Sequence, residues 1–179
     1  EFFKVRYATI KRIDYAGKGG RSFLGGYAAK ELMEEITQTV INQQRNSLRV
    51  LKEINKQLEK ENIFIINETE VTPSQKEFIS EYFISKVSPA LVTIMIGELD
   101  QFPSLKDTAA YLAVKMVMSK EDESFDTKYN YSLIEIPKSV ERFVVLPQEG
   151  EKQYIIILDD LIRYCLHNLF NIFKYESIS

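Results

Sequence analysis

The chain has one cysteine, one histidine and no tryptophan in 179 residues. A single cysteine excludes an internal disulfide and a zinc site built from several thiolates. A single histidine excludes the common metal sites that use two or three imidazoles. No apolar run in the sequence approaches the ~20 residues that span a bilayer, and its start resembles neither a signal peptide nor a transit sequence. These absences predict a cytoplasmic protein without a transmembrane segment.

The charge is nearly balanced, with 23 basic and 26 acidic side chains and a net charge of -3. This balance argues against a general nucleic-acid or membrane-surface function, so we expect no nucleic-acid partner. Hydrophobic residues make up 45% of the chain and charged residues 27%. Such a chain can bury a core, in one domain or in two small ones.

The first positions alternate apolar and basic residues at helical spacing, from Phe2 to Ile13, and predict a helix that ends near Asp14. Its pattern starts at Glu1 without an initiator Met, so we expect the chain to be a fragment. The basic residues form the one local concentration of positive charge. They could bind a polyanion or simply form a solvated helix face. These candidate polyanion contacts are Lys4, Arg6, Lys11 and Arg12.

A glycine-rich stretch covers positions 15–26 and includes Gly17-Lys18-Gly19-Gly20-Arg21-Ser22. A phosphate-binding P-loop needs four residues between its first glycine and a Gly-Lys-Ser/Thr, and it follows a strand. Here the spacing differs and the preceding segment has a helical pattern. We therefore predict a flexible connection rather than a nucleotide site.

Neither proline nor glycine occurs between Tyr27 and Asn62, and apolar residues recur there at helical spacing. This predicts one long helix of about 50 Å. The next residues, Ile63–Ile66, are β-branched and aromatic and predict a buried strand. Because the hydrophobic period changes at this point, we expect two domains: a helical hairpin of residues 1–61 and a small α/β head of residues 62–179.

The head begins with a helix signal, since Thr72-Pro73-Ser74-Gln75 has the pattern of a capping box. This helix should run to Val87, before the Ser88-Pro89 break. Further apolar segments predict strands of one mainly antiparallel sheet. They are Tyr111–Met118, Tyr129–Ile136, Phe143–Leu146 and Tyr154–Leu158. The fold class is therefore α+β.

A last helix is predicted from its apolar stripe between Leu161 and Phe173, with Asp159 or Asp160 as its cap. Cys165 continues this stripe and should be a small core residue. His167 falls off the stripe and should be solvated, because residues two apart point to different helix faces. These residues alone therefore predict no catalytic, cofactor-binding or metal-binding side chain.

Several strings together resemble the long-chain bacterial polyphosphate kinase, the type that phosphorylates itself on histidine. They follow the order of that family over the whole chain. The resemblance implies that residues 1–61 end an N-terminal helical domain and that residues 62–179 form most of the head domain, incomplete at its C-terminus. The strings are EFFKVRYATIKR, NIFIINE, YLAVKM, SLIEIP, RFVVLP and IILDDLIRYCLHNLF.

The resemblance further implies a parent enzyme that reversibly transfers the terminal phosphate of ATP to inorganic polyphosphate through a phosphohistidine, with ATP and Mg²⁺. In that family the catalytic histidines and phosphate-binding arginines lie in two C-terminal domains that this chain does not contain. His167 is not at either position. We therefore expect an inactive chain without a cofactor of its own, in a cytoplasmic parent for which peripheral membrane association stays open.

The same resemblance implies partners: the missing catalytic domains, and a second subunit joined partly through the head domain, which would also wall a polyphosphate tunnel. The long helix supports self-association, because its apolar stripe is longer than the first helix can cover. From the residues alone, a freestanding protein-interaction module and a polyanion-binding module remain open as alternatives.

Overall fold

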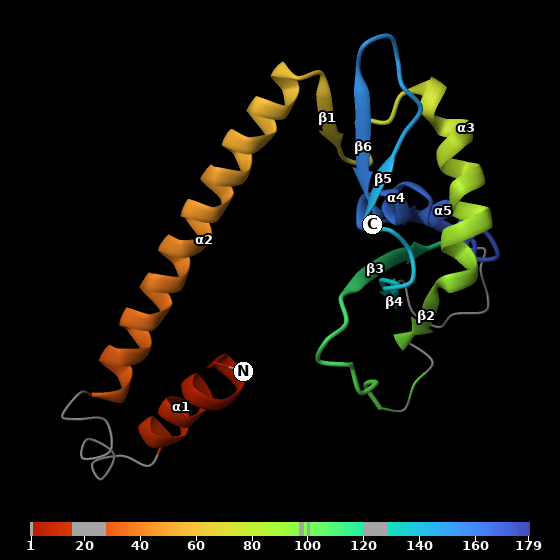
Figure 1. Ribbon diagram of the computed structural model, residues 1–179. Coiled ribbons are helices and arrows are strands. Elements are labelled where there is room, and N and C mark those ends of the chain that lie inside the picture. The colour runs from red at the N-terminus through yellow and green to blue at the C-terminus, as the bar shows by residue number, and fades with distance from the viewer. Residues whose placement is uncertain (1, 16–27, 97–98, 100, 120–128) are drawn as a thin grey trace. The chain divides into compact units, whose positions relative to one another are not determined.

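The computed structural model describes residues 2–15, 28–96, 99, 101–119 and 129–179. The chain divides into two compact units, Glu1–Gln57 and Leu58–Ser179 (Figure 1). The glycine-rich stretch from position 16 to 26, predicted as a flexible connection, lies outside the described residues.

The first unit is helical, as predicted. A π-helical segment, η1 (Phe3–Tyr7), leads into α1 (Ala8–Tyr15), so the helix ends within one residue of Asp14. The next helix, α2 (Ala29–Lys60), is continuous and confirms the long helix expected from the absence of proline and glycine. Glu31 in its first turn and Lys60 in its last turn complement the helix dipole.

The second half of α2 carries an apolar surface. Leu48 is 66% exposed, Leu51 52% and Ile54 50%. Ala29 is the one buried residue of this helix. A stripe of exposed leucine and isoleucine at helical spacing is typical of a surface that another chain segment covers.

A tight turn leads out of α2. The amides of Glu61 and Asn62 donate to the carbonyls of Leu58 and Glu59. Asn62 has φ +59°, in the left-handed region that asparagine tolerates better than most residues. The turn redirects the chain into β1 (Ile63–Ile66), which confirms the predicted strand, but only Ile66 is buried and the other three residues are partly exposed.

The described residues of the second unit form two sheets, so the prediction of one sheet was wrong. The three-stranded sheet has the order β1-β6-β5, with β1 parallel to β6 (Gln153–Ile157) and β5 (Phe143–Val145) antiparallel to it. The four-stranded sheet is antiparallel, with the order β2-β4-β3-β7. Its strands are β2 (Val92–Met95), β3 (Tyr111–Met118), β4 (Tyr129–Glu135) and β7 (Tyr175–Ile178).

The first helix of this unit forms as its sequence predicts. α3 (Pro73–Tyr82) starts with the capping box, in which the Thr72 amide donates to Gln75 Oε1 at 3.0 Å. It continues through the π-helical η3 (Phe83–Val87) and the 3₁₀ turn η4 (Ser88–Ala90). The helical run thus reaches Val87, as predicted.

The end of the chain differs from the single helix that we predicted. α4 (Leu158–Tyr164) ends at Cys165, where ψ is 10°, and the short α5 (Leu166–Leu169) follows. The chain then enters β7 instead of staying helical to Phe173. The break still leaves Phe170 in the core, where it is 1% exposed.

One hydrophobic cluster holds the second unit together. It takes residues from both sheets and from α3, α4 and α5. Its most buried members include Ile79, Met116, Ile134, Ile156 and Leu161, all at 0% exposure. This shared core fixes the end of the three-stranded sheet relative to α4, where the polar groups described next are found.

Candidate functional site

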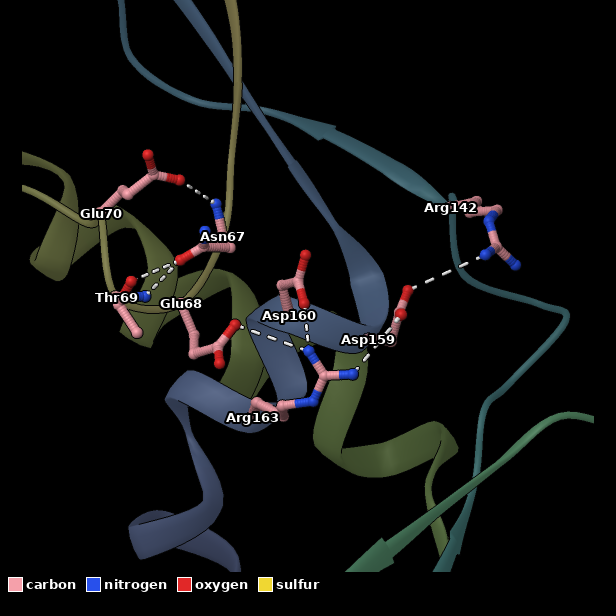
Figure 2. A network of polar contacts seen from close by, with 8 residues as sticks. All are labelled: Asn67, Glu68, Thr69, Glu70, Arg142, Asp159, Asp160 and Arg163. Atoms are coloured by element: carbon pink, nitrogen blue, oxygen red, sulfur yellow. Dashed lines mark hydrogen bonds and ion pairs between the residues drawn. The ribbon is translucent and has the colours of Figure 1, made fainter. Parts of the chain in front are cut away.

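Polar side chains gather where two parallel strands end. Asn67 and Glu68 follow β1, and Asp159 and Asp160 lie in the first turn of α4, directly after β6. Because β1 and β6 are parallel, their carboxyl ends meet at one edge of the sheet. In α/β sheets this edge is where ligands usually bind. We call Glu68, Arg142, Asp159, Asp160 and Arg163 the strand-end cluster (Figure 2).

Arg163 is the centre of this cluster. Its Nη1 donates to Asp160 Oδ1 and lies 3.5 Å from Glu68 Oε2. Its Nη2 lies 4.0 Å from Asp159 Oδ2. One guanidinium therefore neutralises carboxylates from two segments and ties the residues after β1 to α4.

Asp160 is the least exposed of the paired acids, with 15% of its side chain accessible. Burial raises the pKa of Asp160, Arg163 acts to lower it, and Asp159 and Glu68 raise it further. The acids outnumber the cations around this carboxylate. Arg163 is therefore the cation that opposes the rise in the pKa of Asp160.

The loop after β1 is held by its own hydrogen bonds. Asn67 Oδ1 accepts from the backbone amide and the hydroxyl of Thr69, at 2.9 and 2.7 Å. The backbone amide of Asn67 donates to Glu70 Oε2 at 3.0 Å. This Asx turn fixes the segment that presents Glu68 to Arg163, as Figure 2 shows.

A second carboxylate is held at the start of α3. Glu149 Oε1 accepts from the Thr72 hydroxyl at 2.9 Å and from the Ser74 hydroxyl. These hydrogen bonds lower the pKa of Glu149. The arrangement stabilises an ionised acid near a helix N-terminus, so Glu149 has a structural function.

The predicted cap of the last helix was wrong. The residue that precedes α4 is Ile157, which makes no side-chain capping bond, and Asp159 and Asp160 lie inside the first turn. The reason is that β6 runs directly into the helix and leaves no separate capping residue. The two carboxylates pair with arginines instead.

The other predicted side chains stay outside this cluster. Cys165 is 2% exposed, and burial raises the pKa of its thiol to about 12, so it is a core residue as expected. His167 is exposed, as expected, and its Nδ1 lies 2.7 Å from the hydroxyl of Tyr175. The basic residues Lys4 and Arg6 lie in η1, and Lys11 and Arg12 in α1, all exposed.

Sequence reasoning did not single out Arg163, Arg142 or Glu68. For Arg163 a signal was available, because it lies three and four residues after the two aspartates on a predicted helix. Arg142 and Glu68 are brought in by long-range packing, for which spacing gives no signal. Two of the strings that carry the family resemblance, RFVVLP and IILDDLIRYCLHNLF, contain Arg142 and Arg163, respectively.

The cluster does not fit a metal ion. In the part of the chain that the structure describes, no group of three or more His, Cys, Asp or Glu side chains is placed to hold one. The carboxylates near Arg163 already share its guanidinium as their cation.

Among the residues that the structure describes, no helix is long and apolar enough to cross a membrane.

Two models of one protein family match this chain in order. The polyphosphate kinase N-terminal domain matches residues 1–66, and the polyphosphate kinase middle domain matches residues 74–179. Among curated relatives, the polyphosphate kinase of Vibrio parahaemolyticus is 32% identical over 186 residues and that of Escherichia coli is 31% identical over 186 residues. Each match covers 100% of this chain and 25% of the relative.

A solved structure has the same fold. The polyphosphate kinase of Porphyromonas gingivalis matches with a TM-score of 0.72 and 23% identity, over 99% of this chain and 25% of that one. The chain therefore spans about a quarter of the length of the proteins it matches. With the middle-domain model alone matching more than half of its residues, the chain belongs to the polyphosphate kinase family.

Proposed function

We propose that this chain is part of an enzyme that reversibly transfers the terminal phosphate of ATP to inorganic polyphosphate through a phosphohistidine. Residues 1–61 end its N-terminal helical domain, and residues 62–179 belong to its head domain. The observation that supports this is the ordered match of two polyphosphate kinase models along one chain. A cytoplasmic location is part of the proposal, because ATP is the phosphate donor.

In this proposal the chain itself supplies architecture and no catalytic group. Phosphoryl transfer needs a placed nucleophile and cations that stabilise the transferring phosphate. The only histidine, His167, contacts Tyr175, and Arg163, the central cation of the strand-end cluster, is shared by carboxylates. In this proposal ATP and Mg²⁺ act in the rest of the enzyme.

Reading the coding sequence beyond Ser179 tests this proposal. We expect it to continue with domains that carry the phosphorylated histidine and the phosphate-binding arginines. A stop codon directly after Ser179 would contradict the proposal and favour a freestanding module.

We also predict that the chain self-associates and that the head contributes to dimer contacts and to a polyphosphate tunnel in the whole enzyme. The exposed apolar residues of α2, including Leu48 and Leu51, support the first part. Sedimentation equilibrium over a wide concentration range should show a mass that rises above 20.8 kDa and saturates at a dimer or higher oligomer. A monomer at every concentration would contradict self-association, and a mass that never saturates would indicate non-specific contact.

A second candidate function is polyanion binding by the first helix, supported by its four exposed cations. We predict that changing Lys4, Arg6, Lys11 and Arg12 together to Gln weakens binding of a long polyphosphate. Each lost phosphate contact should also reduce the slope of log affinity against log salt, by about 0.7–0.9 for nucleic-acid phosphates. If the affinity for polyphosphate does not change while circular dichroism shows intact helix content, the four cations form only a solvated helix face.

A further inference from the structure

A hollow of about 310 Å³ lies beside the strand-end cluster and shares Arg142 with it. Two cationic residues, Lys138 and Arg142, line the hollow together with Thr108, and among the described residues no acidic residue lines it. The remaining walls are apolar and include Val140 and Leu158. In a chain of net charge -3, a hollow lined by two cations and no acid selects for anions.

Both cations have donors to spare. The Arg142 side chain is 65% exposed, and its ion contact is a single 4.0 Å approach of Nη2 to Asp159 Oδ1. That distance is too long for a hydrogen bond. Asp159 is also shared with Arg163. Lys138 is exposed, and none of the ion pairs among the described residues includes it.

The backbone around the hollow is fixed without a ligand. The Leu158 amide donates to the Arg142 carbonyl at 2.8 Å, and the Ile136 amide donates to the Ala110 carbonyl at 2.9 Å. Pro137 restricts the backbone directly before Lys138. The fold therefore sets the backbone positions from which the two cationic side chains extend.

We propose that this hollow binds a phosphate group between Lys138 and Arg142, with the Thr108 hydroxyl as a further donor. Arginine offers a planar pair of N–H donors that matches phosphate oxygens, and lysine adds a point charge. The nearby Asp159 carboxylate opposes an anion, so the affinity should be modest and sensitive to salt. Inorganic and organic phosphates share this chemistry, and the apolar walls add a surface for an organic group.

Titration of the ¹⁵N-labelled chain with tripolyphosphate at low ionic strength tests the site. Amide shifts should change at residues 138–142 and near Thr108. Lys138→Gln should weaken binding roughly tenfold, the effect of losing one charge-assisted contact. Arg142→Lys keeps the charge and loses the planar donors, so it should weaken binding several-fold. The control Lys86→Gln changes an exposed lysine of η3 outside the hollow and should have no effect.

The same titration with AMP distinguishes the two sources of phosphate. Tighter binding of AMP would support an organic phosphate that uses the apolar walls, and tighter binding of tripolyphosphate would support the inorganic ligand. The proposed site would be contradicted by amide shift changes confined to residues 4–12. Equal losses of binding affinity in the Lys138 and Lys86 variants would also contradict it. So would the absence of shifts at millimolar ligand. The readout is binding alone, so its failure leaves the proposed enzyme function untouched.

Discussion

Ile162→Ala should lower the free energy of unfolding of the second unit by about 2–5 kcal/mol, the usual cost of removing most of a buried isoleucine. Ile162 lies on α4 and is 0% exposed. The matched control is Ile172→Ala, which makes the same chemical change ten positions later. Ile172 is 79% exposed, so the free energy of unfolding of this variant should stay within about 0.5 kcal/mol of that of the unsubstituted chain.

This pair also tests the break at Cys165. In one continuous helix Ile172 would lie seven residues after Cys165, on the same buried face. Denaturant unfolding followed by circular dichroism measures both variants, and Ile162→Val, expected to cost about 0.5–1.5 kcal/mol, serves if Ile162→Ala does not fold. Equal losses for Ile162→Ala and Ile172→Ala would contradict the broken helix.

Arg163→Met should lower the free energy of unfolding by about 1–2 kcal/mol at neutral pH, because it leaves three neighbouring carboxylates without their shared cation. The figure is modest because 42% of the Arg163 side chain is exposed to water. The control is Arg142→Met, which removes a single 4.0 Å contact from a side chain that is 65% exposed. It should cost less than about 0.5 kcal/mol.

The pH dependence of the Arg163 variant has a definite sign. Burial already raises the pKa of Asp160 in the folded chain, and Arg163 opposes this. Between the unfolded and folded pKa values the folded state binds more protons, so stability falls as pH rises. Losing Arg163 raises the folded pKa further. The deficit of Arg163→Met should therefore be largest at neutral pH and shrink toward acid, and a deficit independent of pH would contradict this account.

Local sequence patterns were sufficient for most helices and strands. The absence of proline and glycine predicts α2, and the capping pattern at Thr72 predicts the start of α3. These features depend on neighbours within a few residues. The break at Cys165 could not be predicted, because it depends on how Leu166 and Phe170 both reach a core made by distant strands.

Strand pairing was the main error, for a related reason. β1 and β6 both have continuous apolar runs, which predict burial but not a partner. Their parallel pairing joins residues about 90 positions apart in sequence. Sequence patterning does not indicate β7, because Tyr175–Ile178 covers only four positions and its two partly buried residues are separated by two exposed ones.

The strand-end cluster shows the same difference between contacts within one helix and contacts between distant segments. The spacing of Asp159, Asp160 and Arg163 on one helix is visible in the sequence, although two acids at a helix start also fit the pattern of a helix cap. The contribution of Glu68 depends on the parallel pairing of β1 with β6, which brings the loop after β1 to α4. Charge patterns within one helix are thus readable from the sequence, and pairs that cross between strands are not.

Incubation with γ-labelled ATP tests the central claim most directly, with labelled, acid-insoluble polyphosphate as the readout. The full product of the gene should form polyphosphate. The 179-residue chain alone should form none and should retain no label on His167. Polyphosphate made by this chain, label that is lost in His167→Gln, or a folded full-length product without polyphosphate synthesis would contradict the account.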